Sequence, residues 1–154
     1  MNSTVIFRKP GRPAADAYRL ADQVAAERQV MMVVDDHPVI RQCMQLTAER
    51  TANTEIETYG NPLEALNAFQ SNPDRYRVVI TDYHMPEMTG AELIRGIQAI
   101  QPDQSIVLMS AAANANEVEI ATGRHCRFLR KPFGWAELTE QIEQLESARI
   151  NRRF

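Results

Sequence analysis

The sequence predicts an α/β fold in which a doubly wound, five-stranded parallel sheet is covered by helices on both faces. Five short apolar runs alternate with segments whose apolar residues recur at the helical period. This alternation is typical of βαβ units with parallel strands. Three of the runs are continuously apolar, as expected for strands that are buried on both faces. The 154 residues suffice for one such domain with short flanking segments.

The expected strands cover residues 30–34, 55–59, 77–81, 105–109 and 127–129. The apolar runs at 30–34, 78–80 and 106–109 are continuous, so we expect these strands at the centre of the sheet. The segment 55–59, EIETY, instead alternates between apolar and polar residues. That alternation is typical of a half-buried strand and indicates the edge of the sheet.

The expected helices follow the strands. Pro38 opens the first of them, because proline in the first turn of a helix costs no hydrogen bond. Further helices are expected over residues 63–69, 90–101, 114–121 and 135–149. Before the sheet, prolines and a glycine predict a loose arm over residues 1–12, and apolar residues on one face predict an extra amphipathic helix over 14–28. The expected organisation is therefore an N-terminal segment 1–29, a domain 30–148 and a basic tail 149–154.

Composition excludes several classes of protein. The formal net charge of −3 argues against a polybasic surface that binds nucleic acid. No apolar run is long enough for a transmembrane helix, and the N-terminus lacks the apolar core of a signal peptide. We therefore expect a cytoplasmic protein that contacts neither membrane nor nucleic acid. The two cysteines are far apart, which predicts neither a disulfide framework nor a zinc site.

Charge and lysine are unevenly distributed along the chain. Residues 1–29 carry a net charge of +2 and residues 30–154 a net charge of −5. Of the 17 basic residues only Lys9 and Lys131 are lysines. A lysine in so arginine-rich a chain suggests a position that needs a compact point charge rather than a planar guanidinium.

Polar side chains follow four of the five apolar runs. Asp35 and Asp36 come after the first run, Asp82 after the third, Ser110 after the fourth and Lys131 after the fifth. Ligands of open parallel sheets bind beyond the carboxyl ends of the strands. Three clustered carboxylates repel one another unless a cation intervenes, and their hard oxygens suit Mg²⁺. An aspartate in such a site can accept a phosphoryl group, whose charge an ammonium and a hydroxyl would stabilise.

Four motifs, in this order and spacing, carry a resemblance to a known family. They are VMMVVDDHP (30–38), VVITDYHMPEMTG (78–90), IVLMSA (106–111) and FLRKPF (128–133). Together they resemble the receiver domain of two-component response regulators over about three quarters of the chain. The resemblance implies a CheY-like sheet of strand order 2-1-3-4-5 and a phosphorylation-dependent signalling switch rather than an enzyme.

The resemblance also implies a role for each acidic residue of the site. Asp82 would be the phospho-acceptor and would ligate Mg²⁺. Asp36 would ligate the metal directly, and Asp35 would help through a water molecule. The backbone carbonyl of His84, two residues after the acceptor, would complete the protein ligands of the metal.

The remaining site residues would respond to the phosphoryl group. Ser110 would turn toward it, and Lys131 would pair first with Asp82 and then with the phosphate. Phe128 matches the position of the aromatic switch residue. The Lys131–Pro132 peptide bond, usually cis in this family, would form a tight turn after the strand.

The implied partners are a histidine kinase or phosphotransfer protein as phosphodonor, and a downstream protein on the face of the fourth helix, fifth strand and fifth helix. Only six residues follow residue 148, so we expect a stand-alone receiver that signals by protein contact. Three alternatives stay open: a receiver module of a hybrid histidine kinase, a phosphate sink, and a pseudo-receiver that acts by binding alone. Residues 1–29 could pack as an extra helix, form a homodimer or serve as a linker.

An alternative from another class is a phosphohydrolase that uses an aspartyl-phosphate. An enzyme similar to the haloacid dehalogenases needs a second aspartate two residues after the nucleophile as its general acid and base. His84 occupies that position, and the chain has no room for a cap domain. The sequence therefore favours the signalling switch over the hydrolase.

Overall fold

The computed structural model describes residues 29–50, 54–112, 114, 117, 119, 123 and 125–150. The predicted arm and amphipathic helix over 1–28 lie outside the described residues, as do most of the predicted helix over 114–121 and the end of the basic tail. Among the residues described, no helix combines the length and the apolar character needed to cross a membrane.

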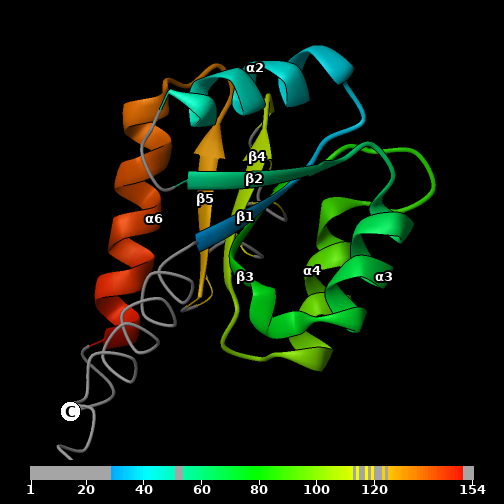
Figure 1. Cartoon of the computed structure of the whole chain (residues 1–154). Coiled ribbons are helices and arrows are strands. Elements are labelled where there is room, and N and C mark those ends of the chain that lie inside the picture. Colours follow the sequence, from blue (N-terminus) through cyan, green and yellow to red (C-terminus); the bar gives the residue numbers. More distant parts are fainter. Residues whose placement is uncertain are drawn as a thin grey trace, which may run out of the picture.

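Five parallel strands form one sheet of order β2-β1-β3-β4-β5, as predicted (Figure 1). The elements are β1 (Gln29–Val34), α2 (Pro38–Glu49), β2 (Thr54–Tyr59), α3 (Pro62–Ser71), the 3-10 helix η1 (Pro73–Arg75), β3 (Tyr76–Asp82), α4 (Gly90–Ile100), β4 (Ser105–Ser110), β5 (Cys126–Arg130) and α6 (Trp135–Ile150). Each predicted strand is found within one residue of its expected start. The 3-10 turn before β3 was not predicted.

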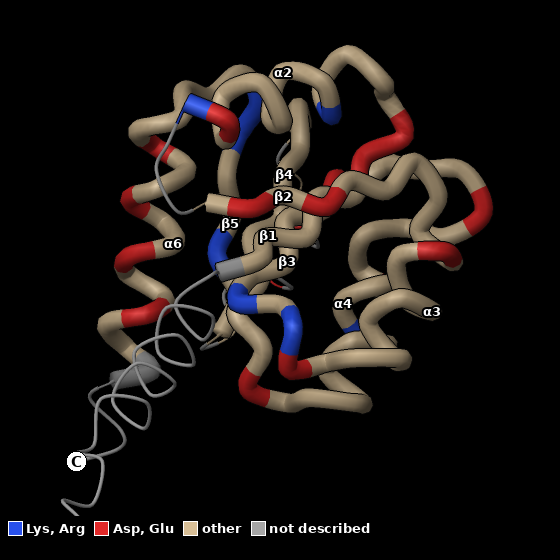
Figure 2. The backbone as a smooth tube through the Cα atoms, in the orientation of Figure 1, with Lys and Arg blue, Asp and Glu red and all other residues tan. Residues whose placement is uncertain are grey.

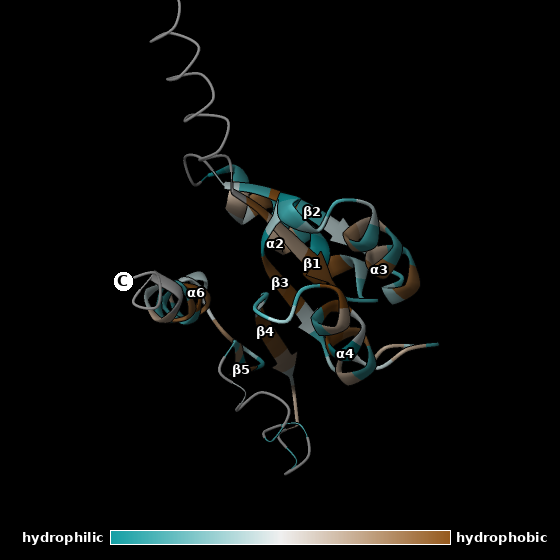
Figure 3. Cartoon of the chain, turned by 90° about the horizontal axis from the view of Figure 1, so that it is seen from below, coloured by the Kyte–Doolittle hydropathy of each residue, from teal (hydrophilic) through white to brown (hydrophobic). Residues whose placement is uncertain are grey.

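Helices cover both faces of the sheet. Helices α3 and α4 pack on one face, where they enclose a core with alternate residues of β1 such as Met32. Helices α2 and α6 pack on the other face around the intervening residues, such as Val33. Successive side chains of a strand point to opposite faces, so a central strand is apolar at every position. Figure 3 shows this arrangement, with the mainly hydrophobic central strands between helices that contain both hydrophilic and hydrophobic residues.

The predicted central strands occupy the centre of the sheet. All side chains of β4 are buried, whereas every residue of the edge strand β2 is half-buried. This confirms the edge position predicted for EIETY.

Local sequence signals account for the helix starts near the site. Asn61 caps α3 through its side-chain oxygen, which accepts from the backbone N–H groups of Leu63 and Glu64. Thr89 and Glu92 form a reciprocal capping box at the start of α4. His37, at the cap position of α2, makes no side-chain capping bond. Its imidazole turns instead toward the acidic residues that precede it.

Candidate functional site

The predicted site residues lie together at the carboxyl edge of the sheet. Asp35 and Asp36 follow β1, while Asp82 and Ser110 are the last residues of β3 and β4. Lys131 follows β5, and its backbone N–H donates to the carbonyl of Ser110 over 2.9 Å. Because β1 and β3 are neighbours in the sheet, their ends bring the three carboxylates to one place, and β4, on the other side of β3, adds the hydroxyl of Ser110, as expected for a parallel α/β sheet.

The ammonium group of Lys131 lies between two carboxylates. Its Nζ donates to Asp35 Oδ2 over 2.8 Å and lies 3.0 Å from Asp82 Oδ1. Asp35 is fully buried and Asp82 is only 5% exposed, so water screens these interactions weakly. The sequence predicted the pair of Lys131 with Asp82 but not the pair with Asp35.

Burial and charge set the ionisation of this pair. Burial raises the pKa of Asp82, the hydrogen bond and charge of Lys131 lower it, and the net shift is upward. For Lys131, burial alone lowers the pKa, but the hydrogen bonds and charges of Asp35 and Asp82 outweigh it, so the pKa is raised. Lys131 therefore stays charged at neutral pH. The single positive charge of its ammonium group does not neutralise the negative charge of the three carboxylates around it.

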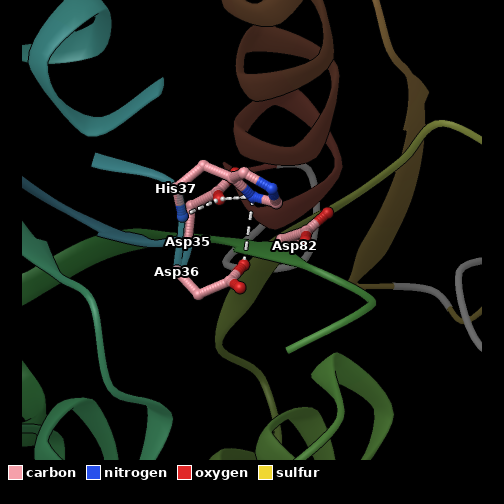
Figure 4. Close-up of side chains that lie close together, drawn as sticks. All are labelled: Asp35, Asp36, His37 and Asp82. Atoms are coloured by element: carbon pink, nitrogen blue, oxygen red, sulfur yellow. Dashed lines mark hydrogen bonds and ion pairs between the residues drawn. The ribbon is translucent and has the colours of Figure 1, made fainter. Parts of the chain in front are cut away.

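The acidic cluster fits a divalent cation. Asp35, Asp36, His37 and Asp82 each offer a ligand atom, and these atoms all lie within 4.8 Å of one another (Figure 4). Asp36 Oδ1 is buried yet makes no hydrogen bond, so this oxygen is available to a ligand. Carboxylate oxygens are the ligands that Mg²⁺ prefers. The residues present thus suit the Mg²⁺ predicted from the sequence.

His84 connects the loop after Asp82 to the segment that follows β4. Its side chain is 63% exposed, and its Nε2 lies 3.0 Å from Oε1 of Glu117, whose side chain is fully buried. Glu117 also accepts hydrogen bonds from the backbone and side-chain amides of Asn114. The imidazole of His84 thus contacts Glu117. The metal-binding role of the His84 backbone carbonyl stays a prediction.

The two predicted switch residues occupy defined positions. Ser110 Oγ donates to the carbonyl of Ala112 over 2.9 Å and accepts from the Ala112 N–H, so the hydroxyl is bonded within its own turn. Phe128 on β5 is half-buried and packs against the core beneath α3 and α4. The Lys131–Pro132 peptide bond is cis, as the resemblance implied. The movement of Ser110 and Phe128 on activation stays a prediction.

A glycine allows the loop after Asp82 to close on the end of β3. The N–H of Gly90 donates to the carbonyl of Tyr83 over 2.8 Å. A Cβ atom on Gly90 would lie 2.3 Å from the carbonyl oxygen of Asp82 and 2.9 Å from the Cα of Tyr83. No side chain fits there, so glycine is needed for the close approach of α4 to the acceptor.

Two residues beside the site were not predicted, Arg41 and His37. The guanidinium of Arg41 donates to the backbone carbonyl of Asp35 over 2.6 Å, and it packs over Gly60, where a Cβ atom would lie 2.9 Å from Nη1. His37 Nδ1 lies 3.2 Å from Asp35 Oδ1 and 3.1 Å from Asp36 Oδ1. The available signal was proximity in sequence, because both residues occur within six positions of the acid pair.

Fold and site together define a class: an α/β domain with a buried acidic cluster and a paired lysine beyond the carboxyl ends of a five-stranded parallel sheet. The family model of the response regulator receiver domain matches residues 31–143. The chain belongs to this family of two-component signalling domains.

Individual relatives agree with this assignment. The chain is 26% identical over 118 residues to a chemotaxis protein CheY homolog of Campylobacter jejuni, covering 75% of this chain and 90% of that protein. It is 29% identical over 119 residues to the response regulator receiver protein CpdR of Brucella abortus, covering 77% and 96%.

Solved structures show the same fold. A response regulator receiver domain protein from Clostridium thermocellum superposes with a TM-score of 0.71 at 27% identity, covering 81% of this chain and 96% of that one. The response regulator TrrA of Thermotoga maritima, solved in complex with Mg²⁺-BeF, gives a TM-score of 0.65 at 30% identity, covering 76% and 98%.

Proposed function

We propose that Asp82 accepts a phosphoryl group from the phosphohistidine of a histidine kinase or phosphotransfer protein, and that the phosphorylated domain signals by protein contact. The observation that carries this proposal is the environment of the Asp82 carboxylate. It is almost completely buried, lies 3.0 Å from Lys131 Nζ and belongs to the acidic cluster. A buried carboxylate beside an ammonium group and a cluster that suits a divalent cation is fitted to attack a phosphoryl group.

In the transfer, an Asp82 oxygen attacks phosphorus and forms an O–P bond. The P–N bond to the donor imidazole breaks, and its electron pair returns to the nitrogen. Lys131, held at Asp82 by its second pair with Asp35, stabilises the charge on the phosphoryl oxygens. Asp35, Asp36 and Asp82, with the His84 carbonyl, would hold a Mg²⁺ ion. When bound, this ion supplies further positive charge to the same oxygens.

The phosphodonor has an apolar surface next to the site on which to dock. On α2, Val39 is 66% exposed and Leu46 is 51% exposed. A groove beside them runs between α2 and the loop after β5 and includes Met44, Phe133 and Trp135. This exposed apolar surface supports approach of the donor over α2, because such patches are typical of protein contacts.

The signal would pass through Ser110. Its hydroxyl bonds to Ala112 in this structure, and a phosphoryl group on Asp82 offers competing acceptor oxygens. If Ser110 turns to them, the turn after β4 loses both bonds and shifts. The population then moves toward a second conformation, with Phe128 following as the aromatic switch residue.

The surface that reads this change is expected to comprise the helix after β4, strand β5 and helix α6. Acidic residues recur along α6 (Figure 2), among them the exposed Glu137, Glu140 and Glu143. A downstream protein that binds here is therefore expected to present basic residues. A receiver module of a hybrid kinase or a phosphate sink would share the phosphoryl chemistry and differ in lacking such a downstream protein.

Intact mass spectrometry tests phosphorylation directly. The chain is incubated with Mg²⁺ and acetyl phosphate, and wild type is compared with Asp82→Asn and Asp103→Asn. Asp103 is exposed in the turn before β4, at the other end of the sheet, so it serves as the matched aspartate. We expect one phosphoryl adduct in wild type and in Asp103→Asn, and none in Asp82→Asn. An equal adduct in Asp82→Asn would overturn the proposal.

A further inference from the structure

The apolar groove between α2 and the loop after β5 lies on the face of the sheet that α2 and α6 cover. Helix α2 packs mainly on β2, whereas α6 packs on β4 and β5, so the two helices lie over opposite sides of this face (Figure 3). Helices α3 and α4 on the other face instead pack against each other. The groove encloses about 370 Å³, with Ile40 and Met44 of α2 on one side and Phe133 and Trp135 on the other. This face therefore has room for a further segment.

The groove continues the apolar core to the surface. Ile40, Phe133 and Trp135 line it and also pack against the core cluster beneath α2 and α6. Among the described residues that line the groove, Lys131 alone is charged. Burial of apolar surface is favourable, and an amphipathic helix that lays its apolar side in such a groove is a common mode of recognition. The groove therefore fits the apolar side of a helix.

The chain itself carries such a helix side just before β1. The sequence predicts an amphipathic helix over residues 14–28, with Ala17, Ala21 and Val24 at helical spacing on its apolar side. Gln29, the first residue of β1, follows directly. Strand β1 contributes to the core cluster beneath α2 and α6, and it lies between β2 and β3 in the sheet. The segment thus joins the sheet beneath the face that carries the groove.

The length and the direction of the segment match this face. The six residues of β1 span about 20 Å, and a helix over residues 14–28 is about 22 Å long. Helix α2 begins at the carboxyl edge of the sheet and ends at the amino edge, because it connects the parallel strands β1 and β2. A helix that turns back over the sheet before β1 has the same direction. Its midpoint, Ala21, then lies level with Cys43 near the middle of α2.

Charge also favours docking within the chain. Residues 1–29 carry a net charge of +2 and residues 30–154 a net charge of −5. Arg8, Lys9 and Arg12 precede the segment, and docking brings them toward the carboxyl edge, where the three carboxylates of the site leave a net negative charge. Complementary charges of this kind set the orientation of a docked segment.

We propose that residues 14–28 dock in the groove of their own chain and cover it. The segment then occupies part of the surface on which the phosphodonor is proposed to dock, so the donor must displace the segment before phosphotransfer. This consequence rests on the proposed function, whereas the docking itself does not.

Cysteine cross-linking tests the docking in the full chain. Cys43 is exposed and lines the groove, whereas Cys126 is buried. In Ala21→Cys the new thiol lies on the apolar side of the segment, and in Ala26→Cys it lies on the opposite side. A disulfide requires Cα atoms within about 7 Å. Under mild oxidation we therefore expect the Ala21→Cys chain to form an intramolecular disulfide with Cys43, identified by peptide mass mapping, and the Ala26→Cys chain to retain its free thiols.

The fluorescence of Trp135 gives a second measurement. Trp135 is the single tryptophan of the chain, and it lines the groove. Val24→Asp places a charge on the side of the segment that docks, where its burial is costly, whereas Ala26→Asp places the same charge on the opposite side. We expect Val24→Asp to increase the quenching of Trp135 by acrylamide and Ala26→Asp to leave it unchanged.

Three results would overturn the inference. Equal cross-linking of Ala21→Cys and Ala26→Cys to Cys43 would show that the apolar side does not hold the segment in the groove. A cross-link between two chains would assign the groove to the segment of a second copy. If no cross-link forms and Val24→Asp leaves the quenching unchanged, the groove is open to the phosphodonor alone. Each result leaves the phosphoryl adduct expected on Asp82 unchanged, so failure of the docking is distinguishable from failure of the proposed function.

Discussion

Replacement of Gly90 by alanine should destabilise the domain, because α4 begins in contact with the backbone of the phospho-acceptor. The new Cβ would lie 2.3 Å from the carbonyl oxygen of Asp82. That distance is more than about 1 Å short of the optimal separation of non-bonded heavy atoms. The nearest atoms belong to backbone at the buried end of β3, so rotation of a side chain cannot relieve the overlap.

The expected size follows from two opposing effects. Overpacking in a well-packed region costs about 1–3 kcal/mol, and the upper end applies because backbone must move. Alanine also lowers the entropy of the unfolded chain, which returns about 0.4–1 kcal/mol. We therefore expect Gly90→Ala to lower the free energy of unfolding by about 2 kcal/mol. The displaced Asp82 should also be phosphorylated more slowly.

Urea denaturation followed by circular dichroism measures the effect. Gly134→Ala is the control, because a Cβ atom at Gly134 meets nothing within 4 Å. Gly134 precedes the first residue of α6, and alanine there should change stability by about 1 kcal/mol or less. If Gly90→Ala unfolds at the same urea concentration as wild type, the steric reasoning is wrong.

Lys131→Arg keeps the positive charge but replaces a compact ammonium by a planar fork, so NMR spectra should show a reduced conformational response to phosphorylation. A full response would contradict the point-charge argument. Gly60→Ala should push the Arg41 guanidinium from the carbonyl that it binds and weaken Mg²⁺ binding by about tenfold. In calorimetry, Arg41→Ala should weaken Mg²⁺ binding by the same factor as Gly60→Ala. The double variant should bind Mg²⁺ no more weakly than either single variant. Burial alone raises the pKa of Glu57, but the bonds and charge of neighbours such as Arg75 outweigh it and lower the pKa. Its contribution to stability is therefore present above the unfolded value of about 4.3 and lost as pH falls through the lower folded value. Glu57→Gln should thus cost about 1 kcal/mol or less at pH 7, and the difference from wild type in urea midpoints should disappear in acid; a constant difference would refute this assignment.

The sheet was predictable because the burial of a strand determines its pattern of apolar and polar residues. Residues 30–34 and 106–109 are apolar at every position, and both segments lie in the centre with helices on each face. The alternation in 55–59 marked the edge strand in the same way. The short helix η1 left no periodic signal, since three residues are too few to show one.

The site was predictable to the level of which residues meet, but not how they pair. Strand ends meet at one edge in any parallel sheet, so Asp82 and Lys131 could be brought together from their positions alone. The hydrogen bond from Lys131 to Asp35 depends on the side-chain conformations of two residues that are 96 positions apart, and the sequence does not specify these conformations. The contact of His84 with Glu117 likewise joins the loop after β3 to a residue after β4, and no local sequence pattern encodes their relative position.

That contact has a consequence for how information leaves the acceptor. Two described residues after β4 contact the site's own elements, Ala112 through the hydroxyl of Ser110 and Glu117 through the imidazole of His84. Under the proposed function, the first contact would respond to the phosphoryl group and the second to the cation. Both contacts would then change together only when the phosphoryl group and the cation are present at the same time.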